Sequence, residues 1–187
     1  MTILTACSQY LHSRLKSPNR QINPKFALHC AHSSRRGNSM RVCGVDINSN
    51  DVHVCLLSLT DELFELPDFR TRKLTLKDIN STQELRYFQQ TFAKLMNDYK
   101  IDRVVIRQRP MKGKFAGGAV GFKLEAAIEL ITDLNVTVMS TTDIKDSLKR
   151  NPIQISYADT DLKAFQEAAF NTAYAYLMKD KFAAKDQ

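Results

Sequence analysis

The sequence predicts an α/β fold in which three antiparallel strands are followed by helix, strand, helix, strand and helix. Two observations support this prediction. Two runs rich in β-branched residues flank a short polar cluster near the start of the folded region. Later β-branched runs alternate with segments whose apolar residues recur at three- and four-residue steps, the period of a helix. We therefore expect a mixed five-stranded sheet with helices on both faces.

The three antiparallel strands are expected between residues 41 and 77. The stretch "RVCGVDINSNDVHVCLLSL" (41–59) holds two apolar runs on either side of the polar cluster 48–51, which is suited to a tight turn. It therefore predicts a β-hairpin. After Pro67 and Asp68 interrupt the pattern, "RTRKLTLK" (70–77) alternates polar and apolar residues and predicts a third, more exposed strand.

The rest of the chain predicts helices alternating with strands. Ser81 or Thr82 would cap a helix that runs to Tyr99. The stretch "IDRVVIRQ" (101–108) predicts an interior strand, because the helices around it must cover the sheet. The expected elements after it are a helix at about 118–132, a strand at 135–140, a short helix capped by Thr141 or Thr142 that stops at Asn151 and Pro152, and a last helix at about 160–180 with Leu162, Phe165, Ala169, Ala173, Tyr176 and Leu177 on one face.

Residues 1–39 differ in composition from residues 40–187, which are expected to form one domain. The first segment has six Lys and Arg, no acid and three of the four histidines. The other 21 of the 27 basic residues accompany all 20 acids, so the domain is nearly neutral and the net charge of +7 is poor evidence for a nucleic-acid partner. We expect residues 1–39 to be an addition from an upstream start codon, a disordered basic tail or an organelle transit peptide.

The apolar segments and the cysteines bear on location. No stretch is long and apolar enough to predict a membrane span or a secretory signal, so no membrane partner is expected. The four cysteines, Cys7, Cys30, Cys43 and Cys55, lack CxxC spacing, and the last two fall within predicted strands. They are expected to be buried thiols in a reducing compartment, the cytoplasm.

Asp46 is the strongest functional signal. It lies in the first predicted strand, where burying a carboxylate is costly unless the group is paired or metal-bound. The alternative is a structural carboxylate that is hydrogen-bonded to the turn at 48–51. His53, which alternates with Asp51 and Cys55 on the second strand, is expected to be an ordinary strand histidine.

These motifs resemble the ribonuclease-H-like superfamily, whose first strand carries a metal-binding aspartate. The arrangement is most similar to the RuvC-type Holliday-junction resolvases. The stretch "RVVIRQ" resembles their fourth strand, and "NVTVMSTTDIKDSLKRN" resembles their fifth strand with its short helix. The stretch "FQEAAFNTAYAYL" resembles their final helix. About residues 40–180 are also similar to an uncharacterised bacterial group, domain of unknown function family 3010, over "RKLTL", "FAKLM", "KGKFAGGAVGFK", "LKRNP" and "AYA".

The resemblance implies hydrolysis of a phosphodiester by two Mg²⁺ or Mn²⁺ ions, which requires several carboxylates close together. Asp46 would bridge both metals, and Glu167 in the final helix would be the second ligand. Asp161 or Asp159, near the start of that helix, is a further candidate. The alternative for Glu167 is a surface ion pair with Lys163, four residues away.

The fourth strand departs from the resolvase pattern. Resolvases end this strand with a glutamate, whereas this chain has Arg107 and Gln108. Gln108 is a further candidate catalytic residue beside Asp46, Glu167 and Asp161, because its carbonyl oxygen can coordinate a metal, although more weakly than a carboxylate. With this departure, a site with one metal ion or none is the alternative to a working pair.

The loop after the fourth strand is basic and glycine-rich, which favours an anion. Its spacing matches neither the P-loop nor the dinucleotide fingerprint. It follows the carboxyl end of a strand, where ligands of open α/β sheets collect, so we expect it to contact a polynucleotide backbone. In the alternative, the glycines serve helix packing and the lysines serve solubility. The candidate nucleic-acid-binding residues are Arg109, Lys112, Lys114 and Phe115, with Phe115 stacking on a base, together with Lys149 and Arg150 of the short helix.

Three functions are compatible with these features. The first is a resolvase-like nucleic-acid-binding protein that cleaves structured DNA or RNA with Mg²⁺ through Asp46 and Glu167; resolution of a symmetric junction would require a homodimer. The second is a non-catalytic binding or regulatory module with a degraded metal site. The third is a binder of small phosphate ligands that uses the glycine loop.

Overall fold

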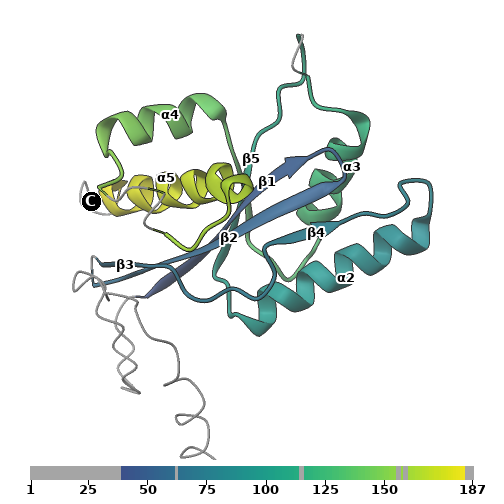
Figure 1. The fold of residues 1–187 in the computed structure, drawn as a ribbon, viewed down its shortest axis with the longest axis horizontal. Coiled ribbons are helices and arrows are strands. Elements are labelled where there is room, and N and C mark those ends of the chain that lie inside the picture. Colours follow the sequence, from purple (N-terminus) through teal and green to yellow (C-terminus); the bar gives the residue numbers. More distant parts are fainter. Residues whose placement is uncertain (1–38, 62, 114–115, 155–156, 158–159, 184–187) are drawn as a thin grey trace, which may run out of the picture. The chain divides into compact units, whose positions relative to one another are not determined.

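The computed structural model in Figure 1 describes residues 39–61, 63–113, 116–154, 157 and 160–183, which belong to one unit, 36–187. Of the predicted segment 1–39, only Ser39 is among the described residues. The strands are β1 (Met40–Asn48), β2 (Asp51–Thr60), β3 (Leu63–Glu65), β4 (Lys73–Thr75), β5 (Arg103–Arg107) and β6 (Val136–Met139). The helices are α2 (Thr82–Asp98), α3 (Ala119–Glu129), α4 (Thr141–Arg150), the 3-10 helix η2 (Ala164–Gln166) and α5 (Glu167–Ala183).

β1 and β2 form the predicted hairpin. They pair antiparallel without interruption from Met40 opposite Leu59 to Asn48 opposite Asp51. The turn between them places Ser49 at φ 56°, in the left-handed region that tight hairpin turns use. Most residues of both strands are buried, because helices cover both faces of the sheet.

The sheet has the order β3-β2-β1-β5-β6, and β4 also pairs with β2. β5 lies parallel to β1 and β6 parallel to β5, so the strand predicted at 101–108 is interior, as expected. The third strand predicted at 70–77 is present as the shorter β4, and β3 at 63–65 is a further strand that the sequence did not predict. β3 pairs with residues 58–60 and β4 with residues 51–53, both antiparallel to β2. The segment between them contains Pro67, which cannot donate a hydrogen bond to a neighbouring strand.

Helices cover both faces of this sheet. One core lies between the sheet and helices α2 and α3, and it includes Val45, Phe92 and Leu124. A second core lies between the sheet and helices α4 and α5, and it includes Val42 and Ala173. The predicted mixed α/β architecture is therefore confirmed. Among the described helices, none combines the length and apolarity that a membrane span requires.

The beginnings of the helices agree only in part with the predictions. Ser81 caps α2 as expected, because its hydroxyl accepts a hydrogen bond from the backbone N–H three residues on. Ser140, rather than Thr141 or Thr142, caps α4, at 3.0 Å from the N–H of Asp143. The sequence offers three consecutive hydroxyl residues here, and the end of β6 at Met139 determines which of them precedes the helix.

The last helix begins later than predicted, at Glu167 instead of about 160. Phe165 therefore lies in η2 and is 40% exposed, rather than on the buried face of α5. Ala169, Ala173 and Leu177 occupy the buried face as expected.

Gly44 brings α5 close to β1. A Cβ at Gly44 would lie 2.0 Å from the carbonyl oxygen of Ala169 and 3.0 Å from the Cβ of Ala173. Ala169 and Ala173 are one helical turn apart and fully buried. The contact therefore depends on small residues on both sides.

Cys43 and Cys55 are buried free thiols, as the sequence predicted. Burial raises the pKa of both thiols, to about 12 for Cys55. Both thiols therefore stay protonated and unreactive near neutral pH. Cys7 and Cys30 lie outside the described residues.

Gly44→Ala is expected to lower the free energy of unfolding by about 3 kcal/mol, because the added methyl group forces α5 away from β1. Gly118→Ala is the matched control, since Gly118 has φ −70° and its Cβ would have no neighbour within 4 Å. A loss of at most about 1 kcal/mol is expected for the control. Urea denaturation measures both values. Equal losses would show that close approach of α5 is not what Gly44 provides.

Candidate functional site

Three adjacent strands each contribute one polar side chain to the face of the sheet that α5 covers. Gly44 contacts α5, and Asp46 lies on the same face because alternate residues of a strand point the same way. Asp46 is directly opposite His53 in the β1–β2 pairing. Val45 pairs with Ile106 of β5, so the next residue, Arg107, lies beside Asp46.

An ion pair neutralises the carboxylate of Asp46. Arg107 Nε donates a hydrogen bond to Asp46 Oδ1 at 2.7 Å, and Asp46 is only 7% exposed. A carboxylate this deeply buried is costly without a charged partner, and the arginine supplies one. Among the described residues, the recorded partners of Asp46 are Arg107 and His53, and the turn at 48–51 is not one of them.

His53 lies on the other side of the carboxylate and is covered by an aromatic ring. Its Nδ1 is 4.0 Å from Asp46 Oδ2, and no hydrogen-bond partner of this nitrogen is found in the described part of the chain. The ring centroid of Phe165 is 4.9 Å from that of His53. The neighbouring Gln166 fixes this arrangement, because its buried Nε2 donates to the carbonyl of Val54 at 2.8 Å.

These residues do not fit a pair of Mg²⁺ or Mn²⁺ ions. A two-metal site needs several carboxylates within a few ångström. No group of three or more His, Cys, Asp or Glu among the described residues is arranged to hold a metal. In addition, the guanidinium of Arg107 already holds an oxygen of Asp46. A metal ion at Asp46 would have to displace the guanidinium of Arg107, and the positive charge of Arg107 would repel it.

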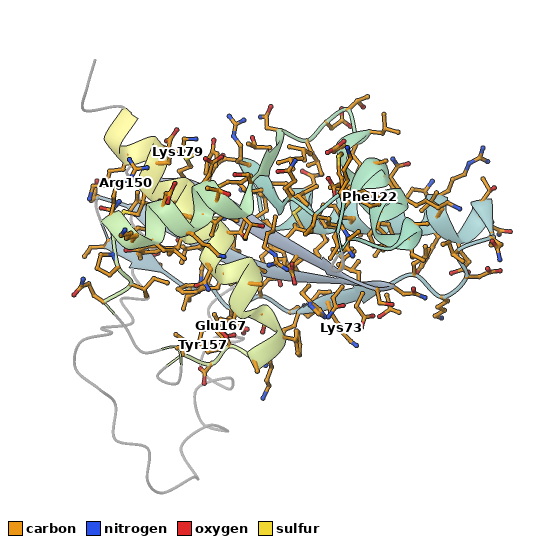
Figure 2. The ribbon with its side chains drawn as sticks, turned by 90° about the horizontal axis from the view of Figure 1, so that it is seen from above. Lys73, Phe122, Arg150, Tyr157, Glu167 and Lys179 are labelled. Carbon is orange, nitrogen blue, oxygen red and sulfur yellow. The ribbon has the colours of Figure 1, made fainter. Side chains whose placement is uncertain are left out.

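Glu167, the predicted second ligand, faces a different neighbour. It is exposed as the first residue of α5, and Figure 2 shows it next to Tyr157. Burial, with contributions from Cys55 and Glu167, raises the pKa of Tyr157 to about 12. Neither a contact with Asp46 nor the alternative ion pair with Lys163 is recorded for Glu167 in the described structure.

No contact of Gln108 or Asp161 with the carboxylate of Asp46 is recorded among the described residues. Gln108 is exposed just beyond β5, where its backbone N–H donates to the carbonyl of Met139. Asp161 is exposed ahead of η2, and Asp159 lies outside the described residues. Of the two residues that end the fourth strand of the predicted fold, Arg107 rather than Gln108 reaches Asp46.

The glycine loop encloses the side chain of Arg109. Its Nη1 donates to the carbonyl oxygen of Ile47 at the end of β1. A Cβ at Gly117 would lie 2.6 Å from Arg109 Nε, and one at Gly121 would lie 2.5 Å from Arg109 Cζ. Two of the glycines therefore leave room for this side chain. Burial raises the pKa of Glu125 on α3, and the nearby charge of Arg109 opposes the rise.

The predicted contact residues of the loop and of α4 lie in separate regions. Lys112 is exposed in the loop, whereas Lys114 and Phe115 lie outside the described residues. Lys149 and Arg150 are exposed at the end of α4. One turn earlier on α4, a serine hydroxyl donates to a carbonyl in the second half of α5 at 3.0 Å. Figure 2 shows Arg150 at that end of the helix pair, away from Glu167.

Lys73 is a cation near the site that the sequence did not single out. It is directly opposite His53 in the β2–β4 pairing, and its Nζ is 3.1 Å from Asp51 Oδ2. A hydrogen bond from Thr75 and the charge of Lys73 lower the pKa of Asp51. The alternating pattern of residues 70–77 predicts which residues share one face of the strand. Together with the pairing partner of that strand, it would have placed Lys73 on the same face as His53.

The described fold is the ribonuclease-H-like α/β fold. The structure is similar to that of Thermus thermophilus RuvC, with a TM-score of 0.62 and 7% sequence identity over 77% of this chain and 97% of the other. It is also similar to T. thermophilus RuvC in complex with a Holliday junction substrate, with a TM-score of 0.57 and 8% identity over 77% and 96% of the two chains. At these identities the likeness concerns the fold alone.

The chain belongs to the family described as protein of unknown function (DUF3010), whose profile matches residues 40–176. A comparison with curated proteins finds no match. The predicted family and the predicted similarity to RuvC-type resolvases are both confirmed.

The pair formed by Asp46 and Arg107 predicts a thermodynamic coupling. Arg107→Gln is expected to lower the free energy of unfolding by about 2 kcal/mol, because a buried carboxylate loses its charged partner. Adding Asp46→Asn is expected to recover about 1 kcal/mol of that loss. Urea denaturation of the four proteins of the double-mutant cycle measures the coupling. Strictly additive losses would contradict the ion pair.

Proposed function

We propose that this chain is a non-catalytic nucleic-acid-binding module that contacts phosphates of structured DNA or RNA beside Asp46. The hydrogen bond of 2.7 Å between Arg107 and Asp46 is the observation that supports it. The bond puts a permanent cation against the carboxylate, at the place where metal ions would act in a nuclease of this fold. A cation at that place can attract a phosphate but cannot activate a water molecule as a metal does.

Arg107 is suited to phosphate binding because Asp46 occupies only its Nε. Among the described residues, no partner is recorded for the two terminal nitrogens of the guanidinium, and the side chain is 41% exposed. A planar guanidinium matches two oxygens of a phosphate group at once. In this proposal Asp46 is a positioning residue, which fixes the direction in which Arg107 presents its donors.

The class of partner is suggested by a protein of similar fold, whereas the absence of catalysis is inferred from Arg107 in this chain. T. thermophilus RuvC has been solved with a Holliday junction, which makes branched nucleic acid the first partner to test. Cleavage with Mg²⁺ through Asp46 and Glu167 is the rival proposal. It would require Arg107 to leave Asp46 and Glu167 to approach Asp46.

The buried free thiols Cys43 and Cys55 agree with a reducing compartment such as the cytoplasm.

Arg107→Gln is expected to weaken binding to a four-way DNA junction about 3- to 10-fold and to reduce the slope of log K against log salt by about one, because one phosphate contact is lost. Arg86→Gln is the matched control, since Arg86 is exposed on α2 over the opposite face of the sheet. Fluorescence anisotropy from about 50 to 200 mM salt measures both quantities. Salt-independent binding, or equal effects of the two substitutions, would contradict the proposal.

No cleavage of a labelled four-way junction or RNA–DNA hybrid is expected with Mg²⁺ or Mn²⁺, as followed by gel electrophoresis. Glu167→Gln is expected to leave the affinity for the junction unchanged, because no contact of Glu167 with Asp46 or Arg107 is recorded among the described residues. Cleavage by the unaltered chain that disappears in both Asp46→Asn and Glu167→Gln would refute the non-catalytic assignment and establish the nuclease.

A further inference from the structure

We infer that the site takes an unpaired nucleotide, whose base stacks on Phe165 while a phosphate of the same strand binds Arg107. The inference rests on the proposed function and specifies the form of nucleic acid. It requires a strand with an accessible base face, which the interior of a continuous duplex does not offer. The occupant is therefore single-stranded nucleic acid or an unpaired segment of a branched one.

An exposed aromatic ring adjoins the ion pair. Phe165 is 40% exposed, and its ring lies 4.9 Å from that of His53. Single exposed apolar side chains are common on protein surfaces, so exposure alone carries no functional meaning. Phe165 differs because its ring lies against His53, which in turn lies beside the ion pair of Asp46 and Arg107. His53 is 4.0 Å from Asp46, and Asp46 is 2.7 Å from Arg107.

The ring is held in place by its own turn. Gln166 donates from Nε2 to the carbonyl of Val54, and its Oε1 accepts a hydrogen bond from the backbone N–H of Lys163 at 3.1 Å. The backbone N–H of Gln166 in turn donates to the carbonyl of Lys163 at 2.7 Å. A platform that is fixed before binding loses little conformational entropy when a base stacks on it.

The spacing of the strands suits a nucleotide. His53 on β2 and Arg107 on β5 are separated by β1, so about 10 Å, or two strand spacings, lie between them. A base and a backbone phosphate of one strand can bridge that distance. Stacking on an aromatic side chain is sequence-tolerant, because every base has a π face. The site is therefore expected to select unpaired bases without selecting their sequence.

Two further basic residues lie near this part of the site. Lys163 is exposed two residues before Phe165, and Lys73 lies opposite His53 on the neighbouring strand. Figure 2 shows Lys73 at the same end of α5 as Glu167. Lys73 is already paired with Asp51, whereas no ion pair is recorded for Lys163 among the described residues. Lys163 is therefore the cation that favours a phosphate backbone over an apolar peptide next to Phe165.

A tryptophan reporter tests the stacking directly. The chain contains no tryptophan, so Phe165→Trp introduces a single emitter. Titration of the full chain with a short oligothymidylate is expected to quench this emission, because a base stacks on the indole. Tyr87→Trp is the matched control, since Tyr87 is 67% exposed on α2, and no quenching is expected there. Equal quenching in both variants, or none in either, would overturn the inference.

A second measurement separates base from phosphate. Phe165→Ala is expected to weaken oligothymidylate binding about tenfold and to leave binding of an abasic strand of equal length unchanged. Phe165→Leu, which keeps an apolar cover over His53, is expected to behave in the same way. Arg107→Gln should weaken binding of both strands. Losses on both strands with the Phe165 variants, or on neither, would overturn the stacking.

The outcomes also distinguish this inference from the proposed function. If the unaltered chain binds a four-way junction with an Arg107-dependent salt slope and Phe165→Ala has no effect on oligothymidylate binding, the inference alone fails. If the unaltered chain binds neither probe in a salt-dependent manner, the proposed function fails with it. Urea denaturation midpoints confirm that each variant is folded when its affinity is measured.

Discussion

The hydrogen bond between Arg107 and Asp46 decides what this end of the sheet can do. A carboxylate buried between strands must be neutralised, and a guanidinium does this permanently, because it does not lose its proton under physiological conditions. The neutralising charge is therefore part of the polypeptide and does not depend on the supply of a divalent ion. The same bond fixes one nitrogen of the guanidinium, and no partner of the other two is recorded among the described residues.

The position of this pair follows from backbone geometry over the whole sheet. The parallel register of β1 and β5 brings Arg107 level with Asp46, and the antiparallel register of β1 and β2 brings His53 opposite it. Gly44 allows α5 to approach β1, and the turn before α5 then lies over His53. The strand register, the absence of a side chain at Gly44 and the start of α5 thus bring Asp46, Arg107 and His53 together with the turn before α5.

Local patterns predicted most of the elements and failed where distant register decides. Strand alternation and helical periodicity located the hairpin, the interior strand and the helices, and the cost of burying Asp46 marked it as special. Whether Arg107 or Gln108 faces Asp46 depends on pairing between residues 61 positions apart, which no local pattern encodes. The glycine-rich loop shows the same limit of local patterns. Glycines that make room for an anion and glycines that make room for the side chain of Arg109 have the same sequence signature.

The short edge strands affect how copies of this domain can meet. β3 and β4, which both pair with β2, have three residues each, and the opposite edge strand, β6, has four. Strands this short offer few unpaired backbone groups to an incoming strand, and the proline between β3 and β4 cannot donate a hydrogen bond to one. The described sheet is therefore a poor template for growth by strand addition or for fibril formation.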